Sequence, residues 1–281
     1  MNWVDAVQQL RERREPGVLV TLTSVRGHAP RQPGAKLVVT ADAQWGSIGG
    51  GNLEAVAVRR ARELLAEGAS SGGGTVETLS QELNEHADAP FGRQCCGGVT
   101  SVLLEVLPVI GSVAIVGMGH VGRELARILA RHDLELHLID GRPEFASAAA
   151  LPAIDDALAR VHWHLAPWPE PVLAELPAGT HLVVMTHDHG EDAAVCDAAL
   201  RRESFASIGL IGSSAKWRRI EKALREWGHD PATTARITTP IGDPTVPGKE
   251  PAAIALAVAT DLVRRLAAQA SDRDATELHR P

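Results

Sequence analysis

The 281-residue sequence contains no tyrosine, only three phenylalanines and six tryptophans. Hydrophobic residues still make up 44% of the chain, which is enough to bury a sizeable core. Because aromatic side chains are so scarce, we expect that core to consist of alanine, valine, leucine and isoleucine. A chain of this length is typical of two domains.

Further scarcities exclude whole classes of protein. Only three cysteines occur, two of them adjacent, which excludes a disulfide-stabilised framework. The net charge is −7 and the basic residues form no cluster, which argues against a nucleic-acid partner. No run approaches the roughly 20 apolar residues of a membrane span, and residues 1–16 lack the apolar core of a secretion signal. We therefore expect a cytoplasmic protein that binds neither membranes nor nucleic acid.

The most informative pattern begins with a short apolar run that is typical of a buried strand. Gly117, Gly119 and Gly122 follow it and give G-x-G-x-x-G. Apolar residues then recur at helical spacing, and a second apolar run ends at Asp140. This order of strand, glycine turn, helix, strand and acid predicts a Rossmann-type fold.

Each part of that pattern has a physical role in dinucleotide binding. The first glycine allows a tight turn, the second lets a pyrophosphate approach the backbone, and the third lets the helix pack close to the sheet. Asp140 stands where a carboxylate would accept a ribose hydroxyl, and it would favour NAD over NADP because it repels a 2′-phosphate. The alternative is a Rossmann-type scaffold that has the glycine turn but binds no dinucleotide.

The pattern of elements divides the chain. Strands alternate with helices after a Pro-Gly boundary near residue 108, which predicts a parallel sheet with right-handed crossovers. We therefore expect an α/β protein: an N-terminal α+β domain over residues 1–108, then a Rossmann-type, doubly wound parallel-sheet domain over 109–270. A helix over residues 252–270 closes this second domain, and residues 271–281 form a polar tail.

Three consecutive glycines, Gly49, Gly50 and Gly51, precede a predicted helix that Asn52 would cap and that runs to about Glu67. Backbone N–H groups at such a helix start can bind an anion. The alternative is a tight strand-to-helix turn without a ligand.

Cys95 and Cys96 lie in a predicted loop, FGRQCCGG, in which glycines flank them and Arg93 precedes them. A nearby cation lowers a thiol pKa, so a thiolate here could be a soft metal ligand, a nucleophile or a persulfide carrier. The alternative is one buried structural cysteine beside an incidental one. Cys196 falls at an apolar position of a predicted helix, where we expect it in the core.

Polar groups follow two strands of the second half. The segment containing His187 could be a metal site, a loop that faces a ligand, or a helix cap made by Asp188 or Asp192. Gly212 and Ser213 could bind an anion at a helix start or merely cap that helix. By contrast, His162 and His164 alternate as expected for a half-exposed strand.

Taken together, these stretches resemble one family. The segments RGHAPRQPGAKLVV, GSIGGGNLE, QCCGG, IVGMGHVG, MTHDH, IGLIGS and PIG…GKEPAAIA occur in an order that is similar to the XdhC/CoxI family of accessory proteins for molybdenum hydroxylases. The resemblance implies a chaperone that binds and protects the molybdenum cofactor in its molybdopterin form. It also implies that the protein assists sulfuration by an L-cysteine desulfurase, delivers the cofactor to xanthine dehydrogenase, and turns over no substrate itself. The family suggests a homodimer.

The resemblance makes Cys95 and Cys96 candidate molybdenum contacts and makes the Gly49–Gly51 turn, Arg31 and Lys36 candidate anion contacts. The full set of candidate cofactor-binding residues is Cys95, Cys96, Gly97, Gly98, Gly49, Gly50, Gly51, Arg31, Lys36, Gly117, Gly119, Gly122, Asp140, His187, Gly212 and Ser213. We identify no candidate catalytic residue. Two other functions are compatible with parts of the sequence: an NAD(P)-dependent oxidoreductase that uses the Rossmann domain, and a thiol-dependent sulfur-transfer enzyme.

Overall fold

The computed structural model describes residues 1–67, 76–82, 98–151 and 156–275, with side chains as far as residue 268. The chain divides into two compact units: residues 1–109 together with those from 267 onwards, and residues 110–266. Among the described residues, no helix is long and apolar enough to cross a membrane. The described core consists mainly of alanine, valine, leucine and isoleucine, as the shortage of aromatic residues predicts.

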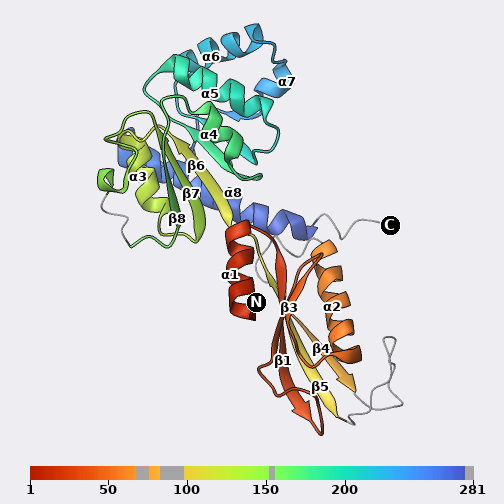
Figure 1. Ribbon diagram of the computed structural model, residues 1–281. Helices are drawn as coiled ribbons and strands as arrows, with labels where there is room; N and C mark the ends of the chain where they lie inside the picture. The colour runs from red at the N-terminus through yellow and green to blue at the C-terminus, as the bar shows by residue number, and fades with distance from the viewer. Residues whose placement is uncertain (68–75, 83–97, 152–155, 276–281) are drawn as a thin grey trace. The chain divides into compact units, whose positions relative to one another are not determined.

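The first unit is built on an antiparallel sheet with the order β3-β2-β1-β5-β4 in its described part. Its strands are β1 (Gly17–Arg26), β2 (Lys36–Val39), β3 (Gln44–Gly46), β4 (Val76–Glu82) and β5 (Val99–Leu107). Helix α1 (Trp3–Arg13) packs on one face and α2 (Gly51–Ala66) on the other, because successive residues of each strand point to opposite faces. Figure 1 shows both helices beside this sheet.

Helix α2 begins differently from the prediction. Gly50, not Asn52, is its N-cap, and Asn52 is buried in the first turn. The reason is that Gly49, Gly50 and Gly51 all adopt positive φ angles, so the chain turns directly into the helix without a capping side chain. The carboxylate of Glu54 instead reaches back and accepts a hydrogen bond from the N–H of Gly50.

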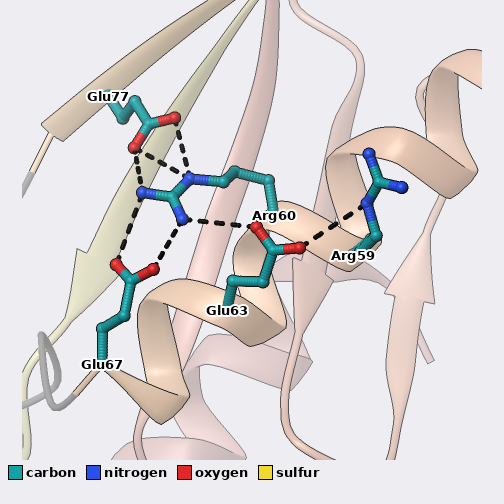
Figure 2. A network of polar contacts seen from close by, with 5 residues as sticks. All are labelled: Arg59, Arg60, Glu63, Glu67 and Glu77. Atoms are coloured by element: carbon teal, nitrogen blue, oxygen red, sulfur yellow. Dashed lines mark hydrogen bonds and ion pairs between the residues drawn. The ribbon is translucent and has the colours of Figure 1, made fainter.

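Arg60 joins α2 to the edge strand β4. Its guanidinium donates to Glu77 on β4, to Glu63 on α2 and to Glu67 at the end of that helix, as Figure 2 shows. The neighbouring Arg59 forms an ion pair with Glu63, at 3.6 Å. Three carboxylates on one cation make this the main polar connection between α2 and β4 in the described part of the unit.

The second unit contains a fully parallel sheet with the order β8-β7-β6-β9-β10-β11 in its described part. Numbered within the unit, this order is 3-2-1-4-5-6, which is that of a dinucleotide-binding Rossmann fold. The strands are β6 (Gly111–Val116), β7 (Leu134–Asp140), β8 (Arg160–Leu165), β9 (His181–Val184), β10 (Ser207–Leu210) and β11 (Ile237–Thr238).

Helices cover both faces of this sheet, which confirms the predicted doubly wound class (Figure 1). Helix α3 (His120–Leu129) and α8 (Pro251–Ala275) pack on one face. The other face carries α4 (Glu170–Glu175), α5 (His189–Arg201) and α6 (Ser214–Glu226), and α7 (Pro231–Thr234) precedes β11. Helix α4 begins within a proline-rich segment, and α8 continues five residues past its predicted end at residue 270.

Candidate functional site

The glycine turn after β6 has the geometry that the spacing predicts. A Cβ atom at Gly117 would lie 2.5 Å from the carbonyl oxygen of Met185, and one at Gly122 would lie 2.2 Å from the carbonyl oxygen of Gly117. These two glycines are therefore required by packing. A Cβ at Gly119 would meet no atom within 4 Å, so the second glycine of the motif faces open space. That is the side from which a pyrophosphate approaches in dinucleotide-binding proteins.

Asp140 ends β7 beside this turn, and the residue is 4% exposed. One oxygen accepts a hydrogen bond from the backbone N–H of Met118 at 2.7 Å. The Arg142 side chain donates to both oxygens, at 2.9 and 2.8 Å. Burial alone would raise the pKa of Asp140, but the hydrogen bonds from Arg142 and Met118 outweigh burial and lower it. Asp140 thus holds the glycine turn in place, and Arg142 occupies the oxygens that a ribose would use.

Arg142 also lies over the ring of Phe145, with its guanidinium carbon 4.1 Å from the ring centroid. A guanidinium stacked on an aromatic face is held in position by cation–π attraction. The side chain is 35% exposed, so it remains accessible to solvent while it pairs with Asp140. Arg142 is not among the residues predicted from the sequence, although its place two residues after the acid is a usable signal.

The polar segment after β9 forms the start of α5. Asp188 is the N-cap and accepts hydrogen bonds from the N–H groups of Gly190 and Glu191. The helix-cap alternative is therefore confirmed for Asp188. His187 is exposed, and among the described residues the side chains of this segment do not converge as a group that could hold a metal ion. Burial raises the pKa of Glu191, and the nearby charge of Asp140 adds to that effect.

Asp192 is fully buried and forms an ion pair with Lys216 of α6. Its other oxygen accepts hydrogen bonds from the N–H and the hydroxyl of Thr186, at 3.2 and 2.9 Å. Gly212 allows this pairing, because a Cβ there would lie 2.7 Å from Cδ of Lys216. Ser213 caps α6 by accepting from the N–H of Lys216. The ammonium group of Lys216, near the helix start at which Gly212 and Ser213 are predicted to bind an anion, is therefore already paired inside the protein.

Cys196 lies in the core, as predicted, with no exposed surface. Burial raises its pKa to about 12, and the negative charge of Asp192 contributes to the rise. A thiol with so high a pKa is unreactive near neutral pH.

A second set of candidate residues meets at one end of the first unit's sheet. We call it the loop cluster and define it as residues 26–31, 49–51 and 98. Gly98 is buried, and a Cβ there would lie 2.4 Å from the carbonyl oxygen of His28 and 2.8 Å from that of Arg26. A Cβ at Gly49 would lie 2.6 Å from Cγ of Pro30. Residues 28–30 therefore run between two glycines that are far apart in the sequence.

The Gly49–Gly51 turn is organised by nearby side chains. Glu54 accepts hydrogen bonds from the N–H groups of Ile48 and Gly50, both at 3.0 Å, and from the hydroxyl of Ser47 at 2.6 Å. The N–H of Gly49 donates to the same serine hydroxyl. Because these donors are engaged within the chain, an anion at the loop cluster would depend on the neighbouring cation.

That cation is Arg31, which is exposed, and whose Cγ lies 3.6 Å from the Cβ position of Gly49. Lys36 is directed elsewhere: its ammonium group donates to the hydroxyl of Thr21 at 2.8 Å and lies 5.3 Å from the ring centroid of Trp3. The predicted contacts Cys95, Cys96 and Gly97 lie outside the described residues.

Both parts of the chain match known protein families. Residues 113–262 match the family model described as the XdhC Rossmann domain, and residues 10–78 match that of the XdhC and CoxI family. The uncharacterized protein YqeB of Escherichia coli strain K12 is 24% identical over 266 residues, which cover 94% of this chain and 46% of that protein. The chain thus spans about half the length of this curated relative. A crystal structure described as a xanthine dehydrogenase from Bacillus halodurans is 17% identical, with a TM-score of 0.47 over 95% of this chain and 96% of that one.

Proposed function

Because the chain belongs to the XdhC and CoxI family, we propose that it is a chaperone of the molybdenum cofactor. In this function it binds the molybdopterin form of the cofactor and protects it. It also assists sulfuration of the cofactor by an L-cysteine desulfurase and delivers the product to xanthine dehydrogenase. The protein works in the cytoplasm as a homodimer, and it carries its cargo without converting a substrate of its own.

The observation that carries this proposal is the convergence of three motifs in the loop cluster. Gly98 directly follows the Cys95–Cys96–Gly97 segment in the sequence, and it packs on the backbone of Arg26 and His28. The loop that begins there also holds Arg31, beside the glycine turn. Gly98, two residues after Cys96 in the sequence, therefore lies in the same cluster as an exposed cation.

The chemistry of the cargo suits such a place. The cofactor has a phosphate group, a polar pterin and a soft dithiolene that holds molybdenum. Cysteine thiolates suit soft metal centres, and an arginine guanidinium suits phosphate because it offers paired donors. In the proposed complex Cys95 or Cys96 contacts the metal or its sulfur atoms, and Arg31 contacts the phosphate.

Retention of the cofactor tests the proposal. Purified protein is mixed with molybdenum cofactor released from a molybdoenzyme, separated by gel filtration, and assayed for bound molybdenum and pterin. We expect Cys95→Ala or Cys96→Ala to reduce retention about tenfold or more, as losses of metal-site groups do. The matched control is Cys196→Ala, which removes a cysteine from the core instead. Equal retention by all four proteins would overturn the proposed role of the thiol pair.

A second variant separates the anion contact from the thiols. Arg31→Gln removes the exposed cation beside the glycine turn of the loop cluster, and we expect about tenfold weaker retention because a hydrogen bond to a charged group is lost. Arg59→Gln, on an exposed face of α2, is the control. Mass spectrometry of the same preparations for a persulfide on Cys95 or Cys96 tests the sulfur-transfer function.

The alternative, an NAD(P)-dependent oxidoreductase, is favoured by the open space at Gly119 and by the strand order of the second unit. It requires Arg142 to leave the carboxylate of Asp140 before a ribose can bind there. Titration with NAD and with NADP tests it. In this function Gly119→Ala weakens binding without unfolding the protein, and saturable binding that Gly119→Ala abolishes would favour the oxidoreductase.

A further inference from the structure

The structure assigns a second binding site to this chain: we propose that Glu135, His137 and His162 bind a divalent transition-metal ion such as Zn²⁺. The three side chains come from the neighbouring parallel strands β7 and β8, in the second unit. One potential ligand atom from each residue lies within 4.8 Å of those of the other two. This proposal is independent of the chaperone function and does not involve the loop cluster.

Strand register explains why these residues meet. His137 is paired with His162, and Glu135 with Arg160, in the parallel ladder between β7 and β8. Residues two apart on a strand share a face, so Glu135 and His137 lie on the same side of β7. The alternating leucines of β7, Leu134, Leu136 and Leu138, point to the opposite face and pack in the core with α3 and α8. The sheet therefore gathers the carboxylate and the imidazoles on one face, beside its edge strand.

The donor set suits Zn²⁺ and its neighbours in the first transition row. Two imidazoles and one carboxylate are the protein ligands of many catalytic zinc sites, which leave a fourth position open. Two ligand atoms that share a tetrahedral ion at about 2.0 to 2.1 Å lie roughly 3.4 Å apart. The rings of His137 and His162 stack, with centroids 4.6 Å apart and planes 13° apart, so their in-plane lone pairs do not converge in this arrangement. Binding therefore requires one ring to turn and the widest pair of ligand atoms to close by at most about 1.4 Å, which side-chain rotation can supply.

Neighbouring groups orient the proposed ligands. One carboxylate oxygen of Glu135 contacts Nε2 of His162, and the other lies 3.6 Å from the guanidinium of Arg160. Nδ1 of His137 lies 3.2 Å from Nε2 of His164. If His137 donates that proton, its Nε2 carries the lone pair that a metal needs. Such outer partners are a regular feature of histidine and carboxylate ligands.

Burial is compatible with binding. Glu135 and His137 are 4% and 8% exposed, whereas the side chain of His162 is 37% exposed and gives an ion access from the sheet edge.

Metal binding to the full chain tests the site. The protein carries Cys95→Ala and Cys96→Ala, so that thiols cannot supply the signal, and is treated with chelator before titration with Zn²⁺. We expect one saturable site per chain. Adding His162→Gln should weaken it about 100-fold or more, because even outer partners of a metal site account for 10- to 100-fold. His132→Gln, in the surface turn before β7, is the matched control. No saturable site, or equal affinity in the His162→Gln protein, would overturn the proposal.

A thiolate at the same position gives a direct readout. In the background without Cys95 and Cys96, His162→Cys should bind Co²⁺ and show a thiolate-to-cobalt charge-transfer band that the parent lacks. Circular dichroism establishes that each variant is folded, and His162 is chosen because its side chain is half-exposed. A folded His162→Cys protein without that band would show that residue 162 does not coordinate the ion.

Discussion

Replacing Lys216 with methionine should be among the most destabilising single changes in the second unit. Lys216 is the cation of the ion pair with Asp192, which has no exposed surface. Methionine keeps most of the length of the unbranched side chain and removes the ammonium group. In this variant Asp192 retains its hydrogen bonds from Thr186 but loses the opposite charge that made its burial tolerable.

The expected magnitude follows from the burial of the pair. Removing one partner of a buried ion pair typically lowers the free energy of unfolding by about 3 to 5 kcal/mol, because the other charge stays buried without compensation. Lys222→Met is the matched control in the same helix, α6. Lys222 lies 3.7 Å from Glu226, with side chains 79% and 64% exposed. We expect that control to cost about 0.5 kcal/mol or less.

Urea unfolding followed by tryptophan fluorescence and circular dichroism measures both variants. Trp217, next to Lys216 and packed against the core, reports on this part of the unit. Asp192→Asn combined with Lys216→Met should recover a large part of the loss, because the uncompensated charge is then removed. If Lys216→Met and Lys222→Met were equally stable within about 1 kcal/mol, burial of the Asp192–Lys216 pair would not make it energetically different from an exposed pair.

Three further expectations concern other polar groups. Arg60→Met should lower the free energy of unfolding, measured by urea titration, by about 1 to 2 kcal/mol because three carboxylates lose their donor. The control Arg59→Met should change it by about 0.5 kcal/mol or less, and equal effects of the two variants would contradict this expectation. Hydrogen bonds from Thr245 lower the pKa of Asp243 to about 2, so its stabilisation is complete above its ordinary pKa of 3.8 and is lost as the pH falls towards 2. The melting temperature of Asp243→Asn should therefore fall less steeply than that of the wild type between pH 4 and 2, and parallel curves would refute the assignment. Finally, Cys196 should resist iodoacetamide at pH 8 in the native protein and react in urea, as peptide mass spectrometry can measure; modification at the same rate in both would be inconsistent with its burial.

Much of the second unit could be predicted because its signals are local. The glycine spacing before α3 and the apolar run that ends at Asp140 each describe one short segment, and the structure confirms the fold that they indicate. Such patterns depend on contacts within one element or between adjacent elements, which periodicity and turn chemistry can detect.

The sites were harder to predict because they depend on pairings between elements. The alternation of His162 and His164 predicts only a half-exposed strand. Their partners Glu135 and His137 are added by the register between β7 and β8, which pairs residues about 25 positions apart in the sequence. In the same way, Lys216 appears available in the sequence, and only the packing of α5 against α6 shows that Asp192 neutralises it.

The glycine turn shows why a fold signature and a ligand are separate conclusions. Gly117 and Gly122 are required by the close approach of backbone atoms, so a Rossmann fold would need them even if nothing were bound. Gly119 is the N-cap of α3, where glycine is one of several favoured residues, and no close contact requires it there. Its lack of a side chain leaves room for a group that approaches the turn. Asp140 is likewise explained within the chain, because it binds Met118 and Arg142. Of the four residues of the signature, therefore, only Gly119 bears on whether a nucleotide or a related phosphate group binds at this turn.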